Sequence, residues 1–198
     1  MTGQSHYPTL YHGSFCIYFS RDENLILLIE RGNKEGFGVP GGYIDIADGK
    51  EQPRQGAIRE FCEEVIFPDG TAVISTLTAD RLSIVDSGID YSTGIPGTTH
   101  MGTSWSGHKC ELTPPEMKTL KAHIAKMAED PAYAHAVRKR SNGELENIVL
   151  TSPDDLQKNM RAATLFFRYP HERMVALAVA AQMQTEQKQQ PQKNGAQC

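Results

Sequence analysis

The heptapeptide REFCEEV at residues 59–65 places three carboxylates, Glu60, Glu63 and Glu64, within five positions. Like charges at helical spacing repel, and each exposed pair costs about 0.2–0.5 kcal/mol. At about 100° per residue, Glu60 and Glu64 share one helical face with Glu63 beside them. Such a set of oxygen ligands would suit magnesium, which commonly takes one or two carboxylates plus substrate phosphates and water. The other interpretation is a solvated helix face with an ion pair between Arg59 and Glu63.

The helix that would carry these carboxylates is predicted to begin at Pro53, because proline suits the first helical turn. It must end before the turn signal at residues 68–70. Its apolar positions recur every three or four residues, which gives it one buried face. These positions are Ala57, Ile58, Phe61, Cys62 and Val65.

The chain before this helix reads as two strands and a glycine-rich loop. SFCIYFS (14–20) and LILLIER (25–31) are apolar runs separated by the turn RDEN, which predicts a hairpin. The loop GNKEGFGVPGGYID (32–45) then leads toward the helix.

Downstream, TAVISTL (71–77) and RLSIVDSG (81–88) predict strands, and ENIVLTS (146–152) predicts a later one. Residues 87–109 are rich in Gly, Ser and Thr, so we expect a long loop with a strand near its end. Capping signals, Thr113 with Glu116 and Ser152 with Asp155, predict helix starts at 114 and 153. A last helix is predicted over 171–182.

Composition narrows the class of protein. At 198 residues, with 39% hydrophobic and 22% charged residues, the chain suits one soluble α+β domain with a mixed sheet. A net charge of −4 gives no reason to expect nucleic acid or an anionic membrane as partner. The four cysteines are far apart, without a CxxC pair, which favours reduced thiols in a cytoplasmic protein. The N-terminus lacks the pattern of a signal peptide, and the apolar runs are too short for a membrane span.

The segment over residues 36–67 resembles the Nudix box. That pattern is Gly, five residues, Glu, seven residues, Arg-Glu-apolar-any-Glu-Glu, any, Gly, apolar. Glu51, the run 59–64 and Phe67 match it, with PGG upstream and the strand–loop–helix order expected. Two features depart from it: Gly42 and Glu51 are separated by three extra residues, and Ile66 stands where the family has glycine.

The resemblance implies a Nudix fold, an α/β/α sandwich with a mixed β-sheet between helices. We expect this domain over residues 1–184 and a disordered polar tail over 185–198, because the tail has no large apolar residue to anchor it.

The resemblance also implies a metal site. Glu60 and Glu64 would be the principal ligands of Mg²⁺, or of Mn²⁺, with Glu63 as a third ligand and the Gly41 carbonyl as a backbone ligand. Arg59 would hold a glutamate by a charge-assisted bond.

Further residues receive roles with alternatives. Glu51 would brace the loop. Arg31, at the end of a predicted strand, would meet a substrate phosphate or else lie exposed. The general base would be Glu64, with Glu144 and Glu146 as other options.

The expected activity is Mg²⁺-dependent hydrolysis of the diphosphate bond in a nucleoside diphosphate linked to another moiety X. The alternative is a Nudix-like module that binds or senses such a nucleotide without cleaving it. The partner would be a small-molecule nucleotide, and the assembly a possible homodimer. No sequence feature selects the nucleotide.

Other candidate residues receive structural interpretations. His100 and His108 lack ligand spacing and are expected on the surface, and His171-Glu172-Arg173 does not have the HExxH spacing of a zinc site. Trp105 is expected to pack in the core or in the long loop, although it could wall a substrate pocket.

Overall fold

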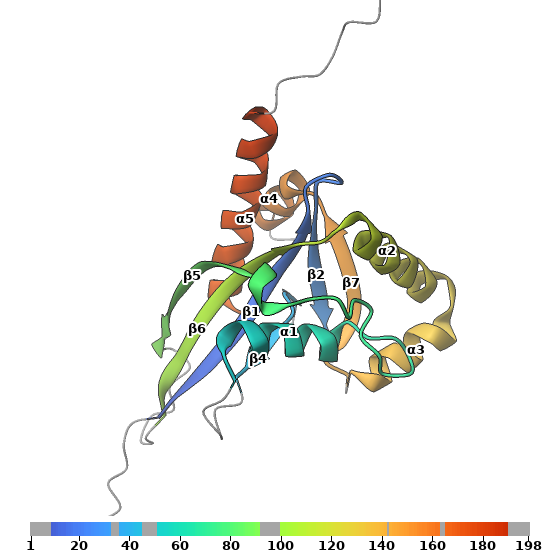
Figure 1. Cartoon of the computed structure of the whole chain (residues 1–198), viewed down its shortest axis with the longest axis horizontal. Coiled ribbons are helices and arrows are strands. Elements are labelled where there is room, and N and C mark those ends of the chain that lie inside the picture. The colour runs from blue at the N-terminus through green and yellow to red at the C-terminus, as the bar shows by residue number, and fades with distance from the viewer. Residues whose placement is uncertain are drawn as a thin grey trace, which may run out of the picture.

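The structure is a computed structural model that describes residues 9–32, 36–44, 51–91, 100–141, 143–162 and 165–189. Figure 1 shows the arrangement of its elements. In chain order they are β1 (Thr9–Ser20), β2 (Leu25–Arg31), β3 (Phe37–Gly38), β4 (Gly41–Tyr43), α1 (Pro53–Glu64), the 3-10 helix η2 (Ala79–Arg81), β5 (Ser83–Asp90), β6 (His100–Glu111), α2 (Pro114–Glu129), α3 (Pro131–Arg140), β7 (Leu145–Thr151), α4 (Pro153–Arg161) and α5 (Pro170–Gln189).

The strands form one mixed sheet in the order β3-β2-β1-β6-β5, with β7 paired to β2 and β4 paired to β1. The long pair β1 and β6 is parallel, and the other pairs are antiparallel. β2 pairs with β1 only at Phe19 and Ser20, next to their turn. Farther along, β4 takes the place of β2 beside Gly13–Phe15. The sheet therefore divides between β1 and β2.

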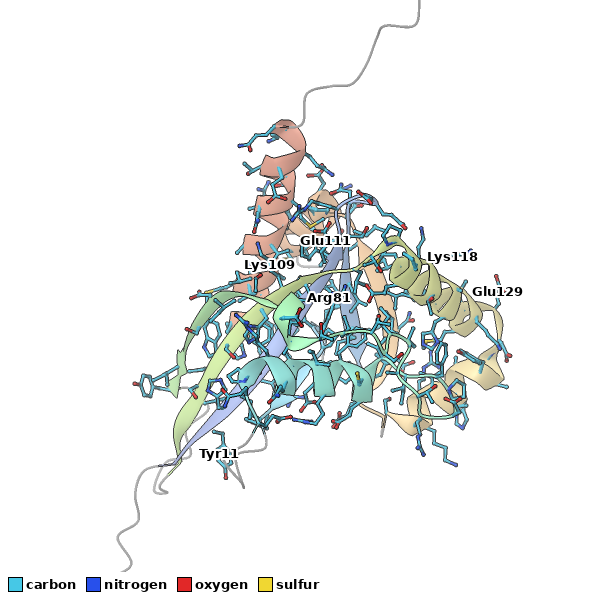
Figure 2. The ribbon with its side chains drawn as sticks, viewed as in Figure 1. Tyr11, Arg81, Lys109, Glu111, Lys118 and Glu129 are labelled. Atoms are coloured by element: carbon cyan, nitrogen blue, oxygen red, sulfur yellow. The ribbon has the colours of Figure 1, made fainter. Side chains whose placement is uncertain are left out.

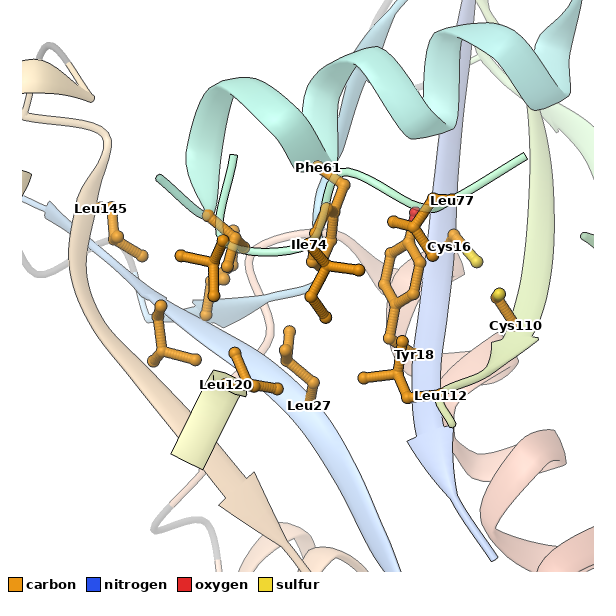
Figure 3. Close-up of a cluster of buried hydrophobic side chains, with 14 of the residues drawn as sticks. Cys16, Tyr18, Leu27, Phe61, Ile74, Leu77, Cys110, Leu112, Leu120 and Leu145 are labelled. Atoms are coloured by element: carbon orange, nitrogen blue, oxygen red, sulfur yellow. The ribbon is translucent and has the colours of Figure 1, made fainter. Parts of the chain in front are cut away.

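Helices cover both faces of the sheet. Successive strand residues point to opposite faces, so Cys16 and Tyr18 join a core with α1, α2 and α3, whereas Ile17 and Phe19 join a core with α4 and α5. Figure 3 shows the first core, in which Phe61 of α1 lies over Tyr18 with ring centroids 4.3 Å apart. The predicted α/β/α arrangement is confirmed.

Several predicted elements agree with the structure, and others need correction. β2 and the start of α1 lie where they were predicted. The strand expected near the end of 87–109 is confirmed as part of β6, whereas the loop expected before it is wrong at residues 87–90, which belong to β5. The strand predicted at 71–77 is also wrong: this segment holds only an isolated bridge between Ile66 and Ala72.

The C-terminal boundary also changes. α5 continues to Gln189, so residues 185–189 are helical and not part of a disordered tail, and Glu186 pairs with Arg21 at 3.0 Å. Residues 190–198 lie outside the described part of the chain. Within that part, no helix has the length and apolar character needed to cross a membrane, and Cys16, Cys62 and Cys110 are free thiols.

Ile66, the departure from the box glycine, has a structural explanation. It is buried, it has no positive φ, and it forms an antiparallel bridge with Ala72. The chain turns back four residues later at Gly70, where φ is +87° and the N–H bonds to the carbonyl of Phe67. The helix exit therefore does not need glycine at position 66, since the left-handed residue has moved to position 70.

Restoring the family glycine should therefore weaken this protein. We expect Ile66→Gly to lower the free energy of unfolding by about 3–5 kcal/mol, because a buried side chain is removed and a cavity remains. Urea denaturation would measure the loss. Ile89→Gly, at an exposed position of β5, is the control and should cost about 1 kcal/mol. Equal costs for both variants would contradict this account of the helix exit.

An ion pair between Arg81 and Glu116 fixes η2 against α2. Arg81 donates to both carboxylate oxygens of Glu116 at 2.7 and 2.8 Å, and to the carbonyl of Glu111 at 2.9 Å. Glu116 also accepts from the backbone N–H of Thr113, which closes the capping box of α2. Hydrogen bonds from Arg81 lower the pKa of Glu116 to about 2.

This pair predicts a loss of stability in acid. The folded-state pKa of Glu116 is depressed from 4.5 to about 2, so its contribution is present above pH 4.5 and disappears as the pH falls toward 2. We expect Glu116→Gln to cost about 1.5–3 kcal/mol at pH 7, and less at pH 3. Denaturation curves at the two pH values would measure this difference. Glu129→Gln, at the exposed end of α2 (Figure 2), should have little effect at either pH, and a cost for Glu116→Gln that does not change with pH would contradict the interpretation.

Candidate active site

A cleft of about 550 Å³ lies where the sheet divides between β1 and β2. Its lining comes from both ends of the fold: β1, the end of β2, β4, α1, the segment before β7 and the first turn of α5. Of the described residues, six with acidic or guanidinium side chains line it: Glu60, Glu64, Glu144, Glu172, Arg31 and Arg168.

The centre of the cleft is a buried group of opposite charges. Arg31, the last residue of β2, has a side chain only 11% exposed. One terminal nitrogen lies 3.5 Å from Glu64 and the other lies 3.4 Å from Glu172. Glu64 also accepts a hydrogen bond from the N–H of Gly41 at 3.0 Å, and Glu172 accepts one from the N–H of Val39 at 3.3 Å.

Burial dominates the protonation of these two carboxyls. It raises the pKa of Glu64 to about 8, against the lowering effects of Arg31 and of the Gly41 N–H. It raises the pKa of Glu172 to about 7, again against Arg31. Burial also raises the pKa of Glu60. Burial of Glu64 and Glu172 therefore outweighs the stabilisation that Arg31 gives to their ionised forms.

Arg59 braces the remaining carboxylates of the REFCEEV helix. It contacts Glu51 at 2.9 Å, Glu60 at 2.8 Å and Glu63 at 3.0 Å, and it donates to the carbonyl of Tyr43 at 2.7 Å. It thus ties α1 to the chain that leaves β4. Glu63, with a side chain 58% exposed, lies outside the lining of the cleft.

The second glycine of the PGG sequence allows α1 to approach the sheet closely. A Cβ atom on Gly42 would lie 2.5–2.6 Å from the carboxylate of Glu60. Because only glycine leaves this space, Glu60 can lie against the backbone of β4 and reach the cleft.

The donor set fits a hard divalent cation. Glu60 and Glu64 both line the cleft, and two carboxylates completed by water and substrate oxygens are a usual environment for magnesium. In the described part of the chain, no group of three or more His, Cys, Asp or Glu side chains is arranged to hold a metal ion. The described residues therefore offer a cation two carboxylates and not a closed cage.

The structure thus gathers some of the predicted site residues and separates others. Glu60, Glu64, Gly41 and Arg31 line one cleft, and Arg59 supports it from outside. Arg31 is enclosed, which excludes the exposed alternative. The extra residues between Gly42 and Glu51 fall mostly at positions 45–50, outside the described residues.

Glu172 is the residue that sequence reasoning missed. It was considered only as part of an HExxH zinc site, which its spacing excludes. A glutamate in the first turn of a mostly apolar helix was the available signal, because charged residues are rarely buried unless they are paired. Its partner Arg31 is 141 residues away in sequence.

Two further expectations are resolved by the structure. His108 was expected on the surface, which is wrong: it is buried on β6, with Nε2 3.2 Å from the hydroxyl of Ser106. The side chain of His100 lies outside the described residues. Trp105 is a core residue and stacks on His171, with ring centroids 5.2 Å apart.

Comparison with known proteins identifies the fold. Neither a family model nor a curated protein matches the sequence. Among solved structures, the Nudix domain of Shewanella oneidensis NrtR in complex with ADP ribose is similar over 91% of this chain and 93% of its own, with 11% identity and a TM-score of 0.54. A Nudix hydrolase from Alicyclobacillus acidocaldarius is similar over 87% of this chain and 92% of its own, with 13% identity and a TM-score of 0.52.

A MutT/nudix family protein from Enterococcus faecalis is also similar, with 13% identity and a TM-score of 0.40, but the match covers 56% of this chain and 40% of that one. That likeness does not extend to the whole fold. The matches to the NrtR domain and to the Alicyclobacillus acidocaldarius hydrolase extend over most of both chains. Together with the arrangement of the sheet and helices, they show that this chain has the Nudix fold.

The close approach at Gly42 gives a test of the site. In Gly42→Ala the new Cβ would displace Glu60, whose flexible end is the obstacle. We expect the free energy of unfolding to change by less than about 1 kcal/mol, and the shift in melting temperature caused by magnesium to shrink. Gly13→Ala in the same cleft is the matched control, since its nearest atoms would lie 3.8 Å away. A full magnesium shift in Gly42→Ala would contradict the role of Glu60.

Proposed function

We propose that this protein is a Mg²⁺-dependent hydrolase, with Mn²⁺ as a possible substitute, that cleaves the diphosphate bond of a nucleoside diphosphate linked to another moiety. The observation that carries the proposal is the pairing of two cleft carboxylates, Glu60 and Glu64, with an enclosed guanidinium, Arg31, in a chain with the Nudix fold. The cleft volume of about 550 Å³ suits a small-molecule ligand.

The charge of the cleft supports a cation between protein and substrate. Among the described residues, four carboxyl groups and two guanidinium groups line the cleft, an excess of acidic groups that disfavours a diphosphate. A divalent cation held by Glu60 and Glu64 would reverse this balance. When bound, it would neutralise phosphate oxygens and lower the pKa of the attacking water.

Hydrolysis adds water across the phosphoric anhydride. The bond from the water oxygen to phosphorus forms, the bond from phosphorus to the bridging oxygen breaks, and the bridging oxygen leaves with the electron pair. A carboxylate accepts the proton of the water. Glu64 is our first candidate for this base, because it is the most enclosed carboxylate of α1.

Two later glutamates are the other candidates for the base. Glu144 lines the cleft, whereas Glu146 lies on β7, half exposed and 3.3 Å from Arg138. The geometry therefore favours Glu144 over Glu146.

Other residues would hold the substrate and the site in place. Arg31 would donate to a phosphate oxygen, and Arg59 would fix Glu60 and Glu63 in their orientations. Tyr43 and Tyr169 line the cleft and offer aromatic faces for a nucleobase. ADP-ribose is the first compound to assay, because the similar Nudix domain of NrtR was solved in complex with ADP ribose.

A nucleotide-binding module without catalysis is the second candidate function. The contact of Glu64 with Arg31 and the exposure of Glu63 favour it, since both reduce the carboxylates available to a metal. Binding of ADP-ribose without phosphate-bond cleavage, in the presence of magnesium or manganese, would decide for this alternative.

The experiment is a panel of nucleoside diphosphate derivatives, assayed with magnesium, for the wild type and for single glutamate variants. We expect Glu64→Gln to reduce turnover by about 10² or more, the scale lost with one positioned acid–base group. Glu146→Gln should retain wild-type turnover, and Glu144→Gln tests the other base in the cleft. Full activity in Glu64→Gln, or no cleavage of any compound by the wild type, would contradict the proposal.

A further inference from the structure

Arg31 is enclosed but weakly bonded. Its polar contacts within the described residues, to Glu64, Glu172 and the carbonyl of Val39, are all 3.4–3.5 Å long. Its Nε atom is buried and has no hydrogen-bond partner among the residues that the structure describes. Strong charge-assisted contacts are about 2.7–2.9 Å long, and Arg59 and Arg81 make them, at 2.8 Å to Glu60 and 2.7 Å to Glu116.

Buried donors are usually well satisfied in native structures, so the long contacts of the terminal nitrogens of Arg31 need an explanation. Arg31 lines the cleft, and a guanidinium group presents five N–H donors in a fork that matches phosphate oxygens. The side chain is therefore held in reach of an anionic ligand without being committed to its protein partners.

Its two carboxylate partners come from opposite faces of the sheet and differ in what else they can do. Glu64 ends α1 and belongs to the carboxylate pair offered to a cation. Glu172 lies in the first turn of α5, and its other oxygen is occupied by the N–H of Val39. Gly38 leaves room for both Arg31 and Glu172, since a Cβ there would lie 2.5 Å from Nε of Arg31 and 2.8 Å from the carboxylate of Glu172.

We propose, on the basis of the function proposed above, that Arg31 is the internal counter-cation of Glu64 in the metal-free protein. When a divalent cation binds Glu64, Arg31 loses its contact with that residue. Its guanidinium group, still bonded to Glu172, then donates to a phosphate oxygen of the diphosphate. Arg31 and the cation thus compete for Glu64, and Glu172 is the positioning residue that keeps Arg31 in the cleft.

Competition predicts opposite effects of one substitution on two ligands. In Arg31→Gln the competing charge is absent, so we expect Mn²⁺ alone to bind about tenfold tighter than to the wild type, or ~1.4 kcal/mol. Inorganic pyrophosphate, titrated against the protein saturated with Mn²⁺, should bind at least about tenfold weaker because its donor is gone. A purely structural role of Arg31 would weaken both.

Arg81→Gln is the matched control. It also breaks an ion pair with a buried glutamate. Arg81, however, lies beside β6 (Figure 2), and neither it nor Glu116 is among the described residues that line the cleft. We expect it to lower the melting temperature and to leave both dissociation constants unchanged.

A double variant separates competition from net charge and protects against a misfolded single variant. Arg31→Gln with Glu172→Gln removes the guanidinium together with its second carboxyl partner, so the net charge of the cleft changes less than in Arg31→Gln alone. Under the proposal it still binds Mn²⁺ tighter than the wild type. Mn²⁺ binding that is unchanged or weaker in both variants, or pyrophosphate binding that is unchanged in Arg31→Gln, would overturn the inference and leave the proposed function standing. No Mn²⁺ binding by the wild type would overturn both.

Discussion

The buried contact of one arginine with two glutamates joins the layers of this molecule. Arg31 ends β2, Glu64 ends α1 on one face of the sheet, and Glu172 lies in the first turn of α5 on the other face. The three meet where β1 and β2 separate, since these two strands pair with each other only at Phe19 and Ser20. Removing charges of either sign would leave a buried group uncompensated, at a cost of about 3–5 kcal/mol. The cleft is therefore both the link between the layers and the place where the fold can bind a ligand.

The same constraint explains how three carboxylates share one short helix segment. The repulsion within REFCEEV is divided between two cations, since Arg59 contacts Glu60 and Glu63 while Arg31 contacts Glu64. Arg59 contacts Glu60 and Glu63 at 2.8 and 3.0 Å, whereas Arg31 lies 3.5 Å from Glu64. One part of the cluster is thus structural and the other part is exchangeable, which is the distinction on which the proposed competition with a metal ion rests.

Local signals in the sequence were sufficient for some elements and not for others. The buried run of β2, the proline at the start of α1, the capping box of α2 and the N-cap of α4 were predicted because each depends on neighbouring residues alone. β6 was predicted only as a strand near the end of a long loop, because Gly102 and Gly107 interrupt it and glycine has weak strand preference. Its conformation comes from an almost continuous parallel pairing with β1, about ninety residues away. Ile66, in place of the box glycine, suggested an altered helix exit. The chain instead makes the left-handed turn at Gly70.

The sequence by itself determined which residue types stand together on α1, the resemblance to the Nudix box, and through it the fold class, because a short helix with a preceding glycine turn fixes these relations locally. Only the tertiary structure decided that Glu60 and Glu64 face a cleft while Glu63 faces solvent. It also decided that Arg31 is enclosed and that Glu172 is its partner. These relations depend on how α1 and α5 pack on opposite faces of a divided sheet, and a contact across 141 residues leaves no periodic or spacing signal in a single sequence.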